Sequence, residues 1–202
     1  MITPPRYKTA RRLGASIYEK TQTPKFALRS ERKAGRREFS RPKTDYGVKV
    51  LEKQRVRFSY GIGERQFARY VGRVNESHDK NRSGKLFEQL ELRLDNVVFR
   101  AGFAPSRQAA RQMVAHGHIT VNGKRVNIPS YQSAVGDSIA IRERTKNTKL
   151  LTGLPERLAD ATRPGWLTLT LEKLEVSIQN PPIPEQPEIL SQLGSVLEFY
   201  RR

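Results

Sequence analysis

The chain has 202 residues and no cysteine, and its 38 Lys and Arg outnumber 20 Asp and Glu, giving a formal net charge of +18. Without cysteine, disulfides, thiolate zinc sites and thiol catalysis are excluded. No run of about 18 apolar residues is present and Met1–Tyr18 lacks an apolar core, so we expect neither a membrane span nor a secretory signal. A charge this positive repels itself unless a polyanion neutralises it. This favours nucleic acid as the partner; an acidic membrane surface is the rival polyanion, and a merely basic protein is the other alternative.

The basic charge is concentrated in the first three quarters of the chain. Residues 1–43 carry 13 basic and 3 acidic residues, and residues 44–150 carry 20 and 10. Residues 151–202 carry 5 and 7. We therefore expect the polyanion to meet residues 1–150, and the last quarter to pack internally or to contact a protein.

The first 43 residues have few apolar positions at regular spacing, so they cannot bury enough surface to fold alone. We predict a basic extended arm that becomes ordered on RNA, as arginine-rich segments do. A solvated, disordered tail is the alternative.

Helical spacing of apolar residues predicts a helix over residues 46–60. Lys49, Lys53 and Arg57 share a separate face of this helix, which we predict to contact RNA. The same spacing predicts a longer helix over residues 85–100, with a broad buried face.

A further predicted helix, over residues 64–74, carries Arg65, Arg69 and Arg73 in one row at i, i+4 and i+8. A solvated helix face usually mixes acids into such a row, because opposite charges at this spacing attract. We interpret the row as a phosphate-facing ridge, with an ordinary solvated face as the alternative.

The segment from residue 106 to 142 predicts a small helix-plus-sheet module. A short helix over residues 107–116, capped by Ser106, should turn Arg107 and Arg111 outward. A strand at 119–121 follows, then the hairpin signal Asn122-Gly123 and a returning strand to residue 128. A third strand is predicted at 138–142. The RNA-contacting residues predicted in this module are Arg107, Arg111, His118, Asn122, Lys124 and Arg125.

Beyond residue 149 the pattern is weaker. It allows a helix at 155–161, strands at 166–171 and 174–178, an extended proline-rich linker and a closing helix at 189–200.

Many short motifs in this chain resemble the ribosomal small-subunit protein four family. The resemblance covers nearly the whole chain and is most specific over residues 44–142. The motifs that carry it are Tyr46–Gly47, Leu51–Gln54, Tyr60–Gly61, Glu64–Phe67, Arg93–Arg100, Gly102–Ala104, Ala110–Val114, His116–Ile119, Val121–Lys124, Ile128–Tyr131, Gly136–Asp137 and Leu197–Tyr200.

The resemblance implies an α+β fold, in which a helical domain is interrupted by a small helix-plus-β-sheet RNA-binding module. After the arm of residues 1–43, the helical domain would span 44–93 and be completed by 179–202. The module with peripheral strands would span 94–178.

The resemblance also implies a structural role in the small ribosomal subunit, in a cytoplasmic or an organellar ribosome. The chain would bind small-subunit rRNA directly at a multi-helix junction, nucleate assembly and influence translational accuracy. Its C-terminal region would contact ribosomal protein five. The arm residues expected near the messenger RNA entry path are Arg36, Arg37, Arg41 and Lys43.

Two features depart from the family pattern. Some members carry four metal-binding cysteines in the arm, and this chain has none, so no metal or other cofactor is expected. The stretch from Asn180 to Glu188 is acidic and proline-rich where relatives are often basic, which argues against RNA contact there.

Enzymatic chemistry finds little support in the sequence. His116 and His118 have only His78 as a further histidine, so a metal site would need carboxylates. Asp95 resembles the catalytic Asp of pseudouridine synthases, but no large catalytic domain follows the module, so we interpret it as structural. A modification-enzyme subunit and a free-standing RNA chaperone or assembly factor are the alternatives to a ribosomal protein.

We expect recognition through the phosphate backbone, because A-form RNA hides its major groove and the planar fork of Arg grips phosphate oxygens in two places. On this basis the double change Arg107→Glu with Arg111→Glu should abolish RNA binding and leave the fold intact.

Overall fold

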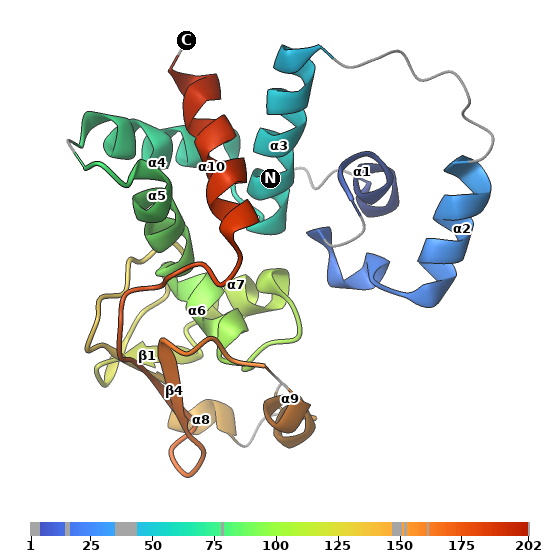
Figure 1. Cartoon of the computed structure of the whole chain (residues 1–202). Coiled ribbons are helices and arrows are strands. Elements are labelled where there is room, and N and C mark those ends of the chain that lie inside the picture. The colour runs from blue at the N-terminus through green and yellow to red at the C-terminus, as the bar shows by residue number, and fades with distance from the viewer. Residues whose placement is uncertain are drawn as a thin grey trace. The chain divides into compact units, whose positions relative to one another are not determined.

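The computed structural model describes residues 5–14, 17–34, 44–77, 79–146, 151, 153–160 and 162–201. The chain divides into two compact units, Met1–Leu86 with Gln186–Arg202 and Phe87–Glu185 (Figure 1). The first unit is helical and the second contains an antiparallel sheet, which confirms the predicted α+β class.

The first unit consists of helices. Figure 1 shows the C-terminal helix, α10, beside α3. The helices predicted over 46–60, 64–74 and 189–200 are present as α3, α4 and α10. The elements of the unit are α1 (Arg6–Leu13), the short 3-10 helix η2 (Glu19–Thr21), α2 (Pro24–Ala34), α3 (Asp45–Ser59), α4 (Glu64–Glu76), the beginning of α5 (Arg82–Glu91) and α10 (Pro187–Tyr200).

The described part of the first 43 residues is not an extended arm. It forms α1, η2 and α2, and the first unit includes it. Ala10, Leu13 and Phe26 are buried, and the Nε of Arg55 in α3 donates a hydrogen bond of 2.8 Å to the carbonyl oxygen of Leu13. The prediction of an extended segment was wrong here. The apolar residues of this segment are too few to show a helical period in the sequence, but they are enough to pack short helices together.

The helices α3, α4 and α10 pack through apolar faces. Thr44 begins α3 by accepting a hydrogen bond from the backbone of Gly47. In α4, Phe67, Val71 and Val74 recur at helical spacing and are fully buried, so the opposite face of this helix is left to solvent.

The helix predicted over residues 85–100 is broken into α5 (Arg82–Glu91) and α6 (Leu94–Arg100). Arg93 adopts an extended backbone and forms an isolated β-bridge with Gln132. The backbone N–H of Leu94 then donates to the carbonyl oxygen of Tyr131 at 2.9 Å. These partners lie some 40 residues further along the chain, so the apolar spacing of the segment could not reveal the break.

The second unit combines short helices with a five-stranded sheet of order β2-β1-β3-β5-β4, in which every neighbouring pair is antiparallel. The returning strand predicted to residue 128 ends at Arg125. After the end of α5, the elements are α6 (Leu94–Arg100), α7 (Arg107–Ala115), β1 (Ile119–Val121), β2 (Lys124–Arg125), β3 (Ser138–Ile141), α8 (Glu143–Lys146), α9 (Leu154–Asp160), β4 (Leu167–Thr170) and β5 (Glu175–Ile178).

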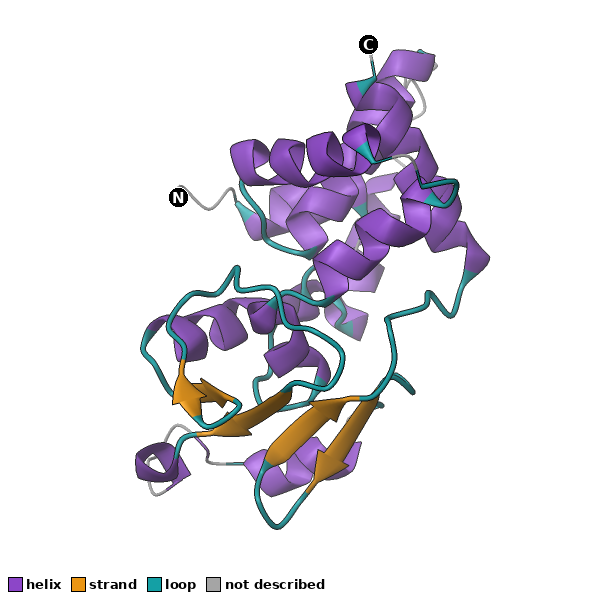
Figure 2. Cartoon of the chain, turned by 90° about the vertical axis from the view of Figure 1, so that its left-hand side faces the viewer, coloured by secondary structure: helices purple, strands orange, loops and turns teal. Residues whose placement is uncertain are grey.

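Alternate residues of the central strands form the core of this unit. Ile119, Ile139 and Val176 are fully buried with Val97 of α6 and Val114 of α7. Figure 2 shows the strands in orange with helices lying over a face of the sheet. This shared core fixes the position of α7 relative to the β1–β2 hairpin, which is part of the sheet.

A tight turn at Asn122 and Gly123 forms the predicted hairpin. Asn122 and Gly123 have φ values of 50° and 75°, and a two-residue type I′ hairpin turn requires positive φ at both positions. The side chain of Asn122 donates to Asp137 at 2.8 Å and accepts from the backbone N–H of Ser138 at 2.9 Å. Asn122 therefore joins the hairpin to the beginning of β3.

A buried carboxylate joins α6 to α7. Asp95 is 3% exposed and accepts hydrogen bonds from Arg93 at 2.8 and 3.0 Å and from Arg111 at 2.6 and 2.9 Å. Arg93 is itself only 2% exposed, so its charge depends on this partner. The interpretation of Asp95 as a structural residue agrees with this position.

We expect Asp95→Ala to destabilise the chain by about 3–5 kcal/mol, because it leaves the buried guanidinium of Arg93 without its carboxylate. Urea unfolding followed by circular dichroism measures the change. Asp79→Ala removes an exposed carboxylate and serves as the matched control, with an expected change within about 0.5 kcal/mol. Equal effects of the two substitutions would contradict the role assigned to Asp95.

Candidate nucleic-acid interface

The arginine row of α4 is a solvent-facing cationic surface. Arg65, Arg69 and Arg73 are all exposed, on the face opposite the buried Phe67 and Val71. None of the three arginines forms an ion pair with another described residue. Each step of four residues advances about 6 Å along the helix, so the row presents three separate guanidinium groups to a ligand.

The basic face predicted on α3 is largely neutralised inside the first unit. Lys49 pairs with Glu198 at 2.6 Å, and Lys53 pairs with Glu64 at 2.7 Å. Lys53 is only 8% exposed, and its ammonium also lies 4.6 Å from the ring centroid of Phe199. Lys53 therefore helps to hold α10 in place. A phosphate contact would be expected at an exposed position, and Lys53 is buried.

Arg57 belongs to the same cluster. Its guanidinium lies 3.4 Å from Glu64 and donates to the side chain of Gln54. The hydroxyl of Tyr200 donates to Glu64 at 2.5 Å. One carboxylate therefore joins α3, α4 and α10.

The environment of Glu64 shifts two pKa values. Burial acts to raise the pKa of Glu64, but hydrogen bonds from Lys53 and Tyr200 and the nearby cations outweigh it and hold the pKa below its ordinary value of 4.5. Burial, followed by the hydrogen bond to Glu64, raises the pKa of Tyr200. The carboxylate is therefore ionised and the phenol neutral at pH 7.

Arg107 and Arg111 do not face outward as the sequence predicted. Arg111 is directed to Asp95, and the Nε of Arg107 donates to Asn96 at 2.8 Å while its guanidinium lies 4.6 Å from the ring of Phe99. Since Arg111→Glu would place a second carboxylate against the buried Asp95, we now expect the double charge reversal to destabilise the fold as well as to weaken RNA binding.

The cations of the second unit gather instead at the turn between α7 and β1. Gly117, at φ +73°, ends α7, and a side chain at this position would collide with the guanidinium of Arg125, which lies over the turn. His118 follows, with Nδ1 at 3.0 Å from the hydroxyl of Thr145. Next along the chain, Lys124 and Arg125 are exposed.

Arg142 joins this turn but was not predicted. Its backbone N–H donates to the carbonyl oxygen of His118 at 2.9 Å, one step beyond the pair Ile119 and Ile141 in the β1–β3 register. Burial, followed by the charges of His116, Arg125 and Arg142, lowers the pKa of His118. Pairing the predicted strands in antiparallel register would have placed Arg142 here.

Asn122, predicted to contact RNA, has both ends of its side-chain amide engaged within the protein, as described above. The four arm residues Arg36, Arg37, Arg41 and Lys43 lie outside the described residues. Among the described residues, no three His, Asp or Glu side chains come together as metal ligands, and no helix is both long and apolar enough to span a membrane.

Comparisons with known proteins show which family this chain belongs to. Residues 2–91 match the family model of the ribosomal protein S4/S9 N-terminal domain, and residues 92–139 match that of the S4 domain. The chain belongs to the ribosomal protein S4 family. The resemblance drawn from its motifs is confirmed.

Two relatives illustrate how much of the chain the family covers. The small ribosomal subunit protein uS4 of Aquifex aeolicus (strain VF5) is 38% identical over 205 residues, which cover 98% of this chain and 97% of the relative. The protein of the same name from Akkermansia muciniphila is 39% identical over 203 residues, covering 99% and 98%. Members of the S4 family are ribosomal proteins and not enzymes, as the sequence predicted.

We expect Glu64→Gln to destabilise this S4 family member at pH 7 and to matter less in acid. The folded-state pKa of Glu64 lies below its ordinary value of 4.5, so its ionised form adds stability above that pH. This contribution is lost as the pH falls through the folded-state pKa. Urea midpoints of the two proteins should therefore converge at low pH, and a pH-independent difference would contradict the assignment.

Proposed function

We propose that this chain is a structural constituent of the small ribosomal subunit and binds its rRNA through at least two cationic surfaces. The observation that carries the proposal is the arginine row of α4, Arg65, Arg69 and Arg73, which is exposed and without internal partners among the described residues. Like charges spaced along one helix destabilise it by mutual repulsion. A phosphate backbone removes that repulsion and accepts bidentate hydrogen bonds from each guanidinium.

The second surface is the α7–β1 turn, with Lys124, Arg125 and Arg142 around His118. His118 lies between α7 and β1, Lys124 and Arg125 form β2, and Arg142 follows β3, so the sheet holds their backbones in fixed relative positions. Backbone positions fixed by a sheet give the cations a defined spacing, which suits recognition of the shape of an RNA backbone. His118, whose pKa is lowered, adds a neutral hydrogen-bonding group to this set at pH 7.

The finer roles follow from the family resemblance. We propose binding at a multi-helix junction of the rRNA, nucleation of subunit assembly and an influence on translational accuracy. The arm residues proposed to lie near the messenger RNA entry path are Arg36, Arg37, Arg41 and Lys43. The C-terminal region is proposed to contact ribosomal protein five, in keeping with its excess of acidic over basic residues beyond residue 150. The ribosome concerned is cytoplasmic or organellar.

The first test measures affinity for the 5′ domain of small-subunit rRNA and for a random RNA of equal length, across a salt series. We expect nanomolar preference for the rRNA with a steep salt dependence, since each neutralised phosphate adds roughly 0.7 to 0.9 to the slope. Equal affinity for both RNAs would contradict specific rRNA recognition.

Arg69→Gln should weaken rRNA binding and lower that slope by about 0.7 to 0.9. Lys173→Gln makes the same change in charge at an exposed site beside Glu172, in the turn between β4 and β5, and should leave both quantities nearly unchanged. If the two substitutions have the same effect, net charge rather than the α4 surface determines binding.

A further inference from the structure

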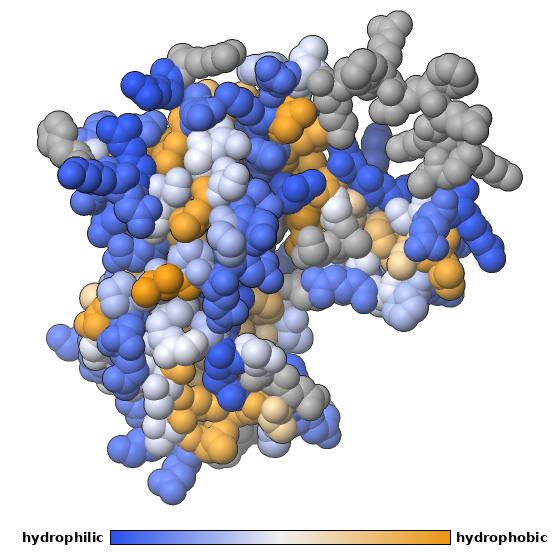
Figure 3. All heavy atoms as spheres, viewed as in Figure 1, coloured by the Kyte–Doolittle hydropathy of each residue, from blue (hydrophilic) through white to orange (hydrophobic). Residues whose placement is uncertain are grey.

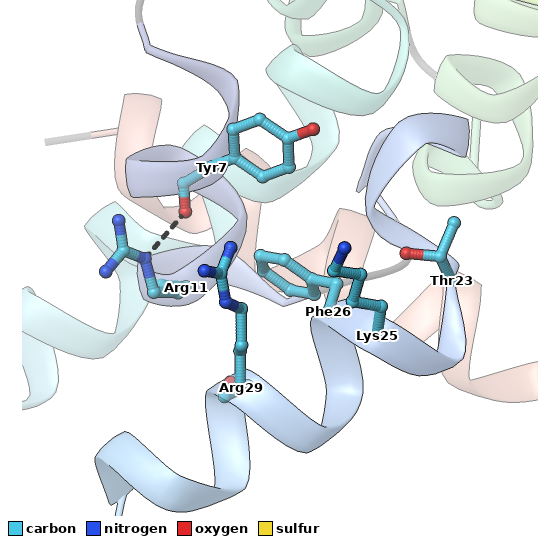
Figure 4. A pocket seen from close by; sticks show the side chains of 7 residues that line it. Tyr7, Arg11, Thr23, Lys25, Phe26 and Arg29 are labelled. Atoms are coloured by element: carbon cyan, nitrogen blue, oxygen red, sulfur yellow. Dashed lines mark hydrogen bonds between the residues drawn. The ribbon is translucent and has the colours of Figure 1, made fainter.

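A cleft between α1 and α2 shares no residue with either proposed surface. Its volume is about 580 Å³, which is within the usual range for pockets that hold small organic ligands. None of its residues was singled out by the sequence as an individual contact. The residues that line it are Tyr7, Arg11, Thr23, Lys25, Phe26, Arg29 and Ser30 (Figure 4).

Two aromatic rings form the apolar part of the cleft. The ring centroids of Tyr7 and Phe26 lie 6.0 Å apart with their planes tilted by 31°. Phe26 is 9% exposed and anchors α2, whereas Tyr7 is 56% exposed and keeps a free ring surface. An exposed tyrosine ring beside a cleft offers a stacking surface for a planar ligand.

Three cations surround these rings, and none of the described residues that line the cleft carries a carboxylate. The Nε of Arg11 donates to the carbonyl oxygen of Tyr7 at 3.0 Å, which fixes the guanidinium and leaves its terminal nitrogens available. Figure 4 shows Arg29 extending from α2 toward α1, where Arg11 lies. Lys25, Arg29 and Arg11 form no ion pair with another described residue, so the cleft concentrates unneutralised positive charge.

The surface around the cleft has the same mixed character. Figure 3 shows apolar atoms at the surface of α2 with strongly hydrophilic residues beside them. An apolar surface rimmed by cations fits a ligand that is planar at one end and anionic at the other. A nucleotide has both parts, because its base is planar and its phosphate is anionic, whereas an inorganic anion has no planar group to stack on a ring.

We infer that the α1–α2 cleft holds one unpaired nucleotide of the bound RNA, with its base stacked on Tyr7 and its phosphate held by Arg11 and Arg29. The inference rests on the proposed RNA-binding function and adds a site that discriminates single-stranded from paired RNA. A base within a duplex is already stacked on both faces and cannot enter the cleft. The α4 row, by contrast, contacts phosphates whether or not the bases are paired.

The test compares binding of the full chain to a short oligouridylate and to an RNA duplex of equal length. Tyr7→Ala should weaken oligouridylate binding by about tenfold, because a base loses its stacking partner. Binding to the duplex should not change. Tyr7→Phe, which keeps the ring, should retain the affinity of the original chain for both RNAs.

A charge-matched pair of variants tests the phosphate contact. Arg29→Gln should lower the salt slope for oligouridylate by about 0.7, the value of one contact to a single strand. Arg32→Gln removes the same charge three residues further along α2, at an exposed position that does not line the cleft, and should change the slope less. In addition, oligouridylate carrying 4-thiouridine should photocrosslink to the peptide that contains Tyr7 or Phe26.

The outcomes separate the inference from the proposed function. Equal weakening of single-stranded and duplex binding by Tyr7→Ala, or equal effects of Arg29→Gln and Arg32→Gln, would overturn the nucleotide site while rRNA binding persists. A chain that binds none of the RNAs overturns both. Preserved circular dichroism of each variant excludes loss of fold as the cause.

Discussion

The arrangement of the second unit depends on one buried carboxylate. Asp95 accepts two arginine forks, from Arg93 before α6 and from Arg111 in α7, and so sets how these two helices meet. The fully buried Glu91 likewise accepts hydrogen bonds from Arg100 and Asn96. Asn96 in turn accepts a hydrogen bond from Arg107. Removing charge from water is costly, so such pairs persist only where every partner is in place. The position of the α7–β1 turn, and of the cations around it, follows from this network.

Pairing with carboxylates inside the protein also determines which of the many cations are available to a ligand. In the first unit, Glu64 neutralises Lys53 and Arg57, and Glu198 neutralises Lys49. The arginines of α4 have no such neighbours among the described residues, nor have those of the α1–α2 cleft. The unneutralised positive charge is therefore concentrated on a few surfaces. The other cations form ion pairs with acidic residues at helix contacts and stabilise the packing of those helices.

Local patterns in the sequence predicted most elements, and the failures share a cause. The hairpin at Asn122 and Gly123 and the helix α4 were predicted correctly, because turn chemistry and apolar spacing are local signals. The break at Arg93 and the inward orientation of Arg111 depend on partners distant in sequence, such as Tyr131 and Asp95. Which cations face solvent was accordingly the least predictable part of the candidate sites. In α3 the spacing located the basic face, but the partner Glu64 that buries Lys53 lies on the next helix.

The position of α10 has a consequence for synthesis of the chain. Its residues, Pro187–Tyr200, complete a unit whose other helices are made from residues before 87, and the whole of the second unit is translated in between. The second unit can therefore fold before α10 has been synthesised, while the apolar faces of α3 and α4 that pack against α10 are still uncovered. During that interval these faces are open to non-native association, a hazard of discontinuous folding units in growing chains. Because α10 follows the whole of the second unit in the chain, the first unit is completed only after that unit has been synthesised.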